Sequence, residues 1–150
     1  MALFDAMFQL SGGITAGGQA ITDSDAASED IIDFTLSDLE MGGGQPYWLN
    51  IRVGTAFAGG TNIVFSLRYD TVAPIDSSST VIWQSAAITT ATLVAGYWVI
   101  RMPLPVNVDE ERIVGLFYDV TGTMSAGTIN AWLDNGPQSS HDTQVTTSNI

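Results

Sequence analysis

The sequence contains no lysine and no cysteine, and its single histidine is His141. The absence of cysteine excludes a disulfide framework and fits a protein that assembles in a reducing cytoplasm. The chain has four scattered arginines and sixteen acidic residues, which gives a formal net charge of −12. Because a phosphate backbone is bound by clustered cations, we expect neither nucleic acid nor an anionic membrane as a partner.

Long hydrophobic runs are also missing. The longest one, from Ala91 to Ile100, is interrupted by Thr92 and Gly96 and is much shorter than the ~18 residues that indicate a membrane span. The first ten residues are apolar, but they contain Asp5 and lack the cationic start of an export signal. We therefore expect a soluble chain without a membrane segment.

The composition is that of a folded protein. The hydrophobic fraction is 45% and only 13% of the 150 residues are charged, which is too apolar for a disordered chain. A chain of this length buries roughly 70% of the surface that its unfolded form exposes and needs neither disulfide nor metal to hold a core. One domain is therefore expected.

Alternation of apolar and polar residues is the strongest pattern in the chain, and it predicts strands. Two of these strands place Arg52 and Arg68 on outward faces. No segment between strands has the length and the helical periodicity of a crossover helix, so the fold class is predicted as an all-β antiparallel sandwich, most simply a jelly roll. The strands are expected at residues 32–36, 47–53, 63–69, 81–85, 97–102, 112–120 and 128–134.

The predicted organisation has three parts: an N-terminal arm (1–19), the jelly roll (20–137) and a polar C-terminal tail (138–150). The arm is apolar and precedes glycine-rich stretches that separate it from the sandwich. Its large side chains either pack on the chain's own sheet or dock on a neighbouring copy or partner. Both alternatives stay open at this point for its five apolar residues, Leu3, Phe4, Met7, Phe8 and Leu10.

A series of short motifs, spread over nearly the whole chain, resembles in order and spacing the cement or decoration proteins of tailed-bacteriophage capsids. The motifs are Ala20-Ile21-Thr22, Ala26-Ala27-Ser28, Ile31-Ile32-Asp33, Gly43-Gly44-Gln45-Pro46, Ala95-Gly96-Tyr97, Leu104-Pro105, Glu111-Arg112, Leu116-Phe117-Tyr118 and Ala126-Gly127-Thr128-Ile129. The resemblance implies a jelly roll that bridges major capsid proteins on the outer capsid surface of a virion, after assembly in the host cytoplasm. It implies no catalytic residue. We also expect a homo-oligomer.

The candidate chemical sites are incomplete. The acidic stretch with Asp23, Asp25 and Glu29 lacks the glycine and the distant glutamate of an EF-hand, so a solvated acidic loop is preferred to a calcium site. Adjacent carboxylates at 109–111 point to opposite faces if they lie in a strand, and are expected to form a rim loop. His141 and Asp142 resemble part of a hydrolase triad, but the sequence contains no nucleophile elbow of the form G-x-S-x-G. We therefore predict no enzyme, metal or cofactor.

Four tryptophans are candidates for contact with a partner. Trp48 and Trp132 fall on the strand face opposite Leu49 and Leu133, which predicts an exposed patch or a contact with another subunit. The other two, Trp83 and Trp98, are expected in the core or in an interface. An alternative function from another class is a carbohydrate-binding module that uses Trp48 or Trp132.

Overall fold

The structure is a computed structural model that describes residues 8–12, 17–22, 24–34, 46–104 and 113–135. All of its regular elements are β-strands, and the described part of the chain contains no helix long and apolar enough to cross a membrane. The strands are β1 (Gln9–Ser11), β2 (Gln19–Ala20), β3 (Ala26–Ala27), β4 (Ile32–Asp33), β5 (Trp48–Val53), β6 (Ala58–Gly59), β7 (Asn62–Asp70), β8 (Thr80–Gln84), β9 (Ile88–Thr89), β10 (Trp98–Pro103), β11 (Ile113–Thr121), β12 (Met124–Ala126) and β13 (Thr128–Asp134).

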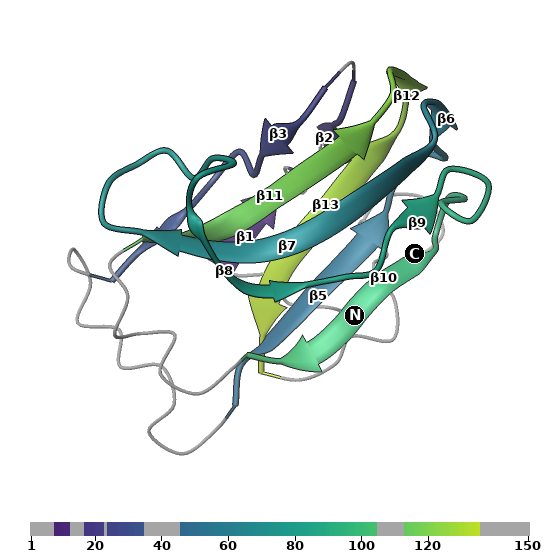
Figure 1. Cartoon of the computed structure of the whole chain (residues 1–150). Coiled ribbons are helices and arrows are strands. Elements are labelled where there is room, and N and C mark those ends of the chain that lie inside the picture. Colours follow the sequence, from purple (N-terminus) through teal and green to yellow (C-terminus); the bar gives the residue numbers. More distant parts are fainter. Residues whose placement is uncertain (1–7, 13–16, 23, 35–45, 105–112, 136–150) are drawn as a thin grey trace, which may run out of the picture.

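Two antiparallel sheets lie one over the other (Figure 1), and β6 and β12 form a separate two-stranded sheet. Sheet A has the order β1-β13-β5-β10, with β2 also on β13. Sheet C has the order β3-β11-β7-β8, with β4 on β11 and β9 on β7. A jelly roll is one long hairpin whose strands pair in a nested order. The nested pairs here are β1·β13, β3·β11, β5·β10 and β7·β8. When such a hairpin is rolled up, β13 comes to lie beside β5 and β11 beside β7. This order confirms the predicted jelly roll.

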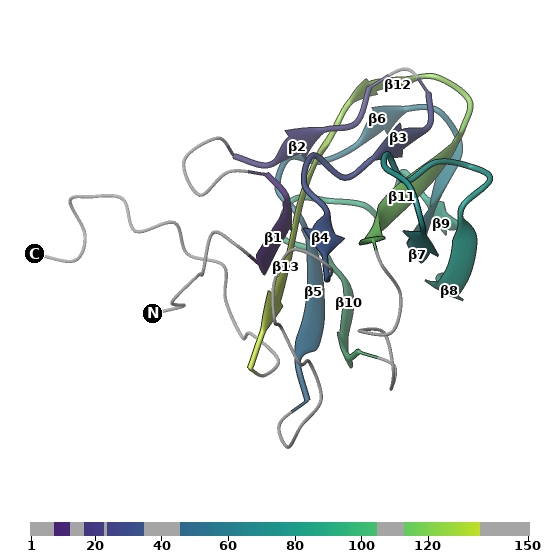
Figure 2. The ribbon, with the colours of Figure 1, turned by 90° about the vertical axis from the view of Figure 1, so that its left-hand side faces the viewer.

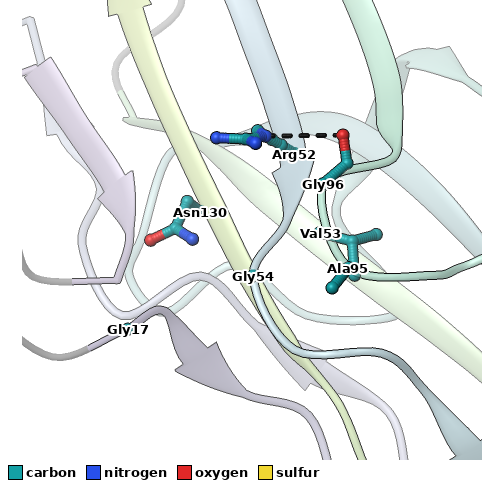
Figure 3. Close-up of a pocket in the computed structure, with 7 residues that line it drawn as sticks. All are labelled: Gly17, Arg52, Val53, Gly54, Ala95, Gly96 and Asn130. Atoms are coloured by element: carbon teal, nitrogen blue, oxygen red, sulfur yellow. Dashed lines mark hydrogen bonds between the residues drawn. The ribbon is translucent and has the colours of Figure 1, made fainter. Parts of the chain in front are cut away.

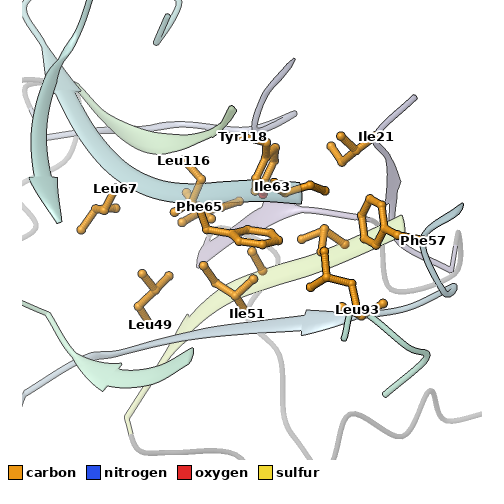
Figure 4. Close-up of a cluster of buried hydrophobic side chains, with 14 of the residues drawn as sticks. Ile21, Leu49, Ile51, Phe57, Ile63, Phe65, Leu67, Leu93, Leu116 and Tyr118 are labelled. Atoms are coloured by element: carbon orange, nitrogen blue, oxygen red, sulfur yellow. The ribbon is translucent and has the colours of Figure 1, made fainter. Parts of the chain in front are cut away.

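The core lies between the sheets and follows the predicted alternation. Ile63, Phe65 and Leu67 of β7 face Leu49 and Ile51 of β5, and all five are fully buried (Figure 4). Further buried side chains come from Leu116 and Tyr118 of β11 and from Ile129 and Leu133 of β13. The rings of Phe65 and Tyr118 meet edge to face, with centroids 5.6 Å apart.

The first strand belongs to this core, which corrects the predicted boundary at residue 20. Leu10 is 1% exposed, and the adjacent hydroxyl of Ser11 lies 2.5 Å from the buried hydroxyl of Tyr118 on the opposite sheet. Phe8 packs against the core and against the ring of Tyr47, at 5.3 Å. For Phe8 and Leu10, packing on the chain's own sheet is therefore the correct alternative. Leu3, Phe4 and Met7 lie outside the described residues.

Two further expectations are corrected or left open. The predicted strand 32–36 is shorter, because β4 ends at Asp33 and Phe34 lies in a turn. β6, which lies just before β7, pairs with β12, and this pairing was not predicted from the sequence. The predicted C-terminal tail, 138–150, lies outside the described residues.

The position of Leu10 generates a stability prediction. Leu10→Ala should lower the free energy of unfolding by about 2–5 kcal/mol, because it leaves a cavity that the two sheets cannot close. Val72→Ala is the control, since that side chain is 65% exposed and surface substitutions change stability by only about 0.5 kcal/mol. Urea denaturation measures both. An equally small effect at both positions would mean that β1 is not part of the core.

Candidate interaction site

The outer face of sheet A carries a cluster of tryptophan and arginine side chains. Inward packing of Ile51 and Val53 turns Arg52 outward, and its neighbours across the two adjacent strands are Trp98 on β10 and Asn130 on β13. We call the set Arg52, Trp98, Arg101 and Trp132 the tryptophan face. It assembles residues from three strands that are far apart in the sequence.

Trp98 is the centre of the tryptophan face. The guanidinium carbon of Arg101 lies 4.7 Å from its ring centroid and that of Arg52 lies 5.5 Å away. Both distances fall within the ~6 Å over which a ring attracts a cation. The ring also meets that of Trp132, with centroids 5.8 Å apart. Two of the chain's four arginines thus converge on one ring in a protein of net charge −12.

The two tryptophans selected from the sequence have different surroundings. Trp132 lies outside the core cluster but is only 2% exposed, so the expectation that it forms an exposed patch is wrong. Alternation predicts the face on which a side chain lies and says nothing about what covers that face. Trp48 is half-buried and lies opposite Asp134 of β13. Trp98, which the sequence did not single out, is the tryptophan contacted by two arginines.

A pocket with a volume of about 360 Å³ adjoins the tryptophan face at Arg52 (Figure 3). Arg52 Nε donates a hydrogen bond of 3.4 Å to the carbonyl oxygen of Gly96. A Cβ at Gly54 would lie 2.5 Å from the carbonyl oxygen of Gly17, so glycine is needed there for the backbones to approach. The lining residues are Gly17, Arg52, Val53, Gly54, Ala95, Gly96 and Asn130.

The polar groups of this pocket suit binding. Asn130 is 4% exposed, and its Oδ1 accepts no hydrogen bond from the part of the chain that the structure describes. The seven lining residues supply one guanidinium and one amide, and none of them carries a carboxylate, imidazole, hydroxyl or thiol. General acid–base or nucleophilic catalysis uses those groups. The pocket therefore offers donors and acceptors that could hold a polar group of a partner.

Arg68 is outward-facing as predicted, but it is buried beneath the loop that joins β7 to β8. Its Nη1 donates to the carbonyl oxygens of Asp76 at 3.1 Å and Ser77 at 2.8 Å, and its Nε donates to Ser66 Oγ at 2.9 Å. Its guanidinium carbon lies 4.5 Å from the ring centroid of Phe117. Arg68 thus fixes the loop on the outer face of sheet C.

Asp76 of this loop and Asp70 at the end of β7 are stabilised in their charged form. The hydroxyl of Ser78 lowers the pKa of Asp76 from 3.8, and the Ser78 N–H adds to that effect. The hydroxyl of Ser79 lowers the pKa of Asp70, together with the N–H groups of Thr71 and Val72. Folding therefore favours the ionised form of both side chains.

The acidic segment expected to form a solvated loop has exposed carboxylates, and two of them accept backbone hydrogen bonds. Asp25 Oδ1 accepts a hydrogen bond from the N–H of Val120 at 2.7 Å, and Glu29 Oε2 accepts one from the N–H of Gly12 at 3.2 Å. Within the described ranges, no group of three potential metal ligands lies together. Asp23, the carboxylates at 109–111, and His141 with Asp142 lie outside those ranges.

Residues 15–133 match the model of the Bbp16 family. The match begins before β2 and ends within β13, so it covers every strand of the two sheets except β1. No curated protein matches the chain.

Arg68 generates a prediction about stability. Arg68→Lys should lower the free energy of unfolding by roughly 2–4 kcal/mol, because one ammonium cannot replace the bonds that the planar guanidinium makes to Ser66 and to the loop carbonyls. Arg101→Lys makes the same chemical change at an exposed position and should have little effect. Guanidinium chloride denaturation compares the two variants. Equal stability would show that the network around Arg68 is dispensable.

The lowered pKa of Asp76 generates a prediction about pH. A carboxyl whose pKa is depressed on folding contributes stability above its unfolded pKa, and that contribution is lost as the pH falls through the folded pKa. Asp76→Asn should therefore lower the melting temperature near neutral pH and match the wild type at low pH. Calorimetry from about pH 7 to about pH 2 measures the difference. Asp119→Asn, which removes a charge from an exposed position of β11, is the control. A constant difference at all pH values would contradict the prediction.

Proposed function

The chain belongs to the Bbp16 family, and on that premise we propose that it is a capsid cement protein. It binds the outer surface of a bacteriophage capsid and stabilises contacts between major capsid subunits. A protein that binds only the assembled shell stabilises that shell by mass action. Many copies on a symmetric lattice multiply a modest individual contact.

The motifs that carry the resemblance to cement proteins occupy structural positions in the jelly roll. The Gly96 N–H donates to the carbonyl of Val53, where the chain turns into β10. Gly127 packs so closely under the ring of Phe57 that a Cβ would lie 2.1 Å from it. Leu116-Phe117-Tyr118 lies in the middle of β11, between β3 and β7. The resemblance and the fold therefore support each other at particular residues.

The tryptophan face is the single observation that carries the proposal. Tryptophan and arginine are the residue types that supply most of the binding energy in protein interfaces, and here they are held against one another on an outer sheet face. The adjoining pocket offers a guanidinium and an amide for a polar group of the partner. These features suit adhesion to another protein surface.

No particular observation favours the carbohydrate-binding alternative. A sugar stacks on an accessible ring, but of the two tryptophans named for this alternative Trp132 is 2% exposed and Trp48 is half-buried. The proposal includes no catalytic residue and no cofactor. The major capsid protein as partner, the outer capsid surface as location and the homo-oligomer all stay predictions.

The proposed function predicts shell binding that depends on Arg101. Added to shells assembled from the cognate major capsid protein, the chain should cosediment with them and raise the temperature at which they disrupt. Arg101→Ala should weaken binding about tenfold, as loss of an interface contact commonly does. The melting temperature of the isolated chain should hardly change, because this side chain is exposed.

Arg101→Lys separates stacking from charge in the same assay. Lysine keeps the positive charge but lacks the planar group that stacks on Trp98, so this variant should bind nearly as weakly as Arg101→Ala. Full binding by Arg101→Lys would assign the effect to charge alone. Failure of the wild-type chain to bind or stabilise shells would contradict the proposed function.

A further inference from the structure

The pocket beside Arg52 contains two polar side chains from neighbouring strands of sheet A. Arg52 of β5 and Asn130 of β13 are directly opposite each other in the register of the two strands, and side chains paired in this way have Cβ atoms about 4.5–5.5 Å apart. Figure 2 shows β13, β5 and β10 next to one another on one side of the molecule and β7 and β8 of sheet C on the other. One small group on the outer face of sheet A can therefore touch both side chains.

Glycine at two positions keeps this pocket open. A Cβ at Gly54 would lie 2.9 Å from Asn130 Nδ2, and a Cβ at Gly96 would lie 3.3 Å from Arg52 Nη2. A larger residue at either position would therefore crowd the polar group beside it. No other lining residue has a polar side chain, so the amide and the guanidinium are the side-chain groups with which a polar ligand can bond.

The fold itself makes little use of the Asn130 amide. The side chain is 4% exposed, and its Oδ1 accepts no hydrogen bond from the part of the chain that the structure describes. A buried polar group without a partner destabilises a fold, so native structures contain few of them and each calls for an explanation. A β-branched apolar residue would suit a buried strand position better. A ligand bonded to Nδ2 in the pocket explains why an amide stands at this position.

The groups that face the pocket are hydrogen-bond donors. Arg52 Nε donates to the carbonyl oxygen of Gly96 at 3.4 Å, and Figure 3 shows the rest of the guanidinium extending toward β13, the strand of Asn130. A carboxylate only accepts hydrogen bonds, and its two oxygens match the fork of a guanidinium. With a single guanidinium, the pocket suits the one charge of a carboxylate better than the nearly double charge of a phosphate group.

We propose that the pocket binds a carboxylate group, which is held by the guanidinium of Arg52 and by Nδ2 of Asn130. The carboxylate belongs either to a small free acid or to an Asp or Glu side chain of the shell. Recognition of the carboxylate is independent of the cement function, and only its use in adhesion rests on that proposal. A net charge of −12 repels acidic surfaces, so a pocket lined by an arginine and by no carboxylate gives an acidic group a place to bind.

Titration of the isolated chain with acetate tests the site directly. The NMR signals of the Asn130 side-chain amide and of Arg52 Nε–H should shift saturably, with a dissociation constant on the order of 1–10 mM, because a ligand of so few atoms has little binding energy. The Nε–H signal of Arg101, which does not line the pocket, should shift much less. Acetamide has almost the same shape without the charge and should bind at least about tenfold more weakly. Sodium chloride at equal ionic strength controls for screening.

Two variants remove the proposed contacts. Arg52→Gln replaces the guanidinium by an amide, and Asn130→Leu replaces the amide by an apolar group of nearly the same shape. Each should abolish saturable binding of acetate in this range. Asn130→Leu should keep or raise the melting temperature, because the Oδ1 that it removes has no partner among the described residues. Asn135→Leu, just after β13 at an exposed position, is the matched control and should bind acetate like the wild type.

Three results would overturn the carboxylate site and leave the cement function standing. They are saturable acetate binding by either pocket variant, equal binding of acetamide and acetate, and wild-type shifts no larger than those caused by sodium chloride. If Asn130→Leu fails to fold, Arg52→Gln alone decides the outcome, because Arg52 is only half-buried.

Binding to shells of the cognate major capsid protein identifies the source of the carboxylate. If an acidic side chain of the shell occupies the pocket, acetate at about ten times its dissociation constant should displace the chain from shells more than sodium chloride does at equal ionic strength. Arg52→Gln should then also bind shells more weakly. If acetate leaves shell binding unchanged, the carboxylate is that of a small free acid. A wild-type chain that binds acetate but no shells would contradict the cement function and leave the carboxylate site standing.

Discussion

The jelly roll depends on β13, because both edges of this strand are paired. Along one edge lie β1 and β2, the first strands of the chain, and along the other lies β5. The pairings with β1 and β2 join residues more than a hundred positions apart, so they close long loops and carry the entropic cost of that closure. Ile129 and Leu133 offset that cost by filling the core. The same strand presents Asn130 and Trp132 on the opposite face, so the pairing that completes the sheet also builds the candidate site.

The outer faces of both sheets depart from the simple polar exterior of a sandwich. On sheet C, Ile75, Ile113 and Phe117 form a second small cluster with Ala27 and Ile31. On sheet A, Asn50 and Trp132 are buried although they point away from the core. The arginines take part in both arrangements, since each of the three in the described ranges lies against an aromatic ring. A guanidinium is weakly hydrated and stacks well, so here it acts as part of the packing.

The sequence was sufficient to predict the long strands and their faces. The strands predicted at residues 47–53, 63–69 and 128–134 correspond to β5, β7 and β13, and Arg52 and Arg68 lie on the outward faces predicted for them. The two-residue strands β2, β3, β4, β6 and β9 are too short to show any period. Leu10 was misplaced because the nearby glycines suggested separation, while its partners lie on β13. The tryptophan face could not be predicted because its residues come together only when three distant strands pair. The register of one of these strands, β10, also contains a bulge between Trp98 and Ile100.

The distribution of charge connects the fold to the way such a protein can associate. A net charge of −12 keeps a chain soluble and opposes contact with another acidic surface. Association therefore needs places where the repulsion is locally absent. The described residues include two such places: the tryptophan face, where Arg52 and Arg101 lie against Trp98, and the uncharged segment that contains β8 and β9. Salt screens the interaction between exposed charges over a Debye length of about 8–10 Å near physiological ionic strength. Contacts at the uncharged segment of β8 and β9 should therefore depend less on ionic strength than contacts at the arginines. The dependence of binding on salt concentration therefore distinguishes the two surfaces, and both are consistent with adhesion.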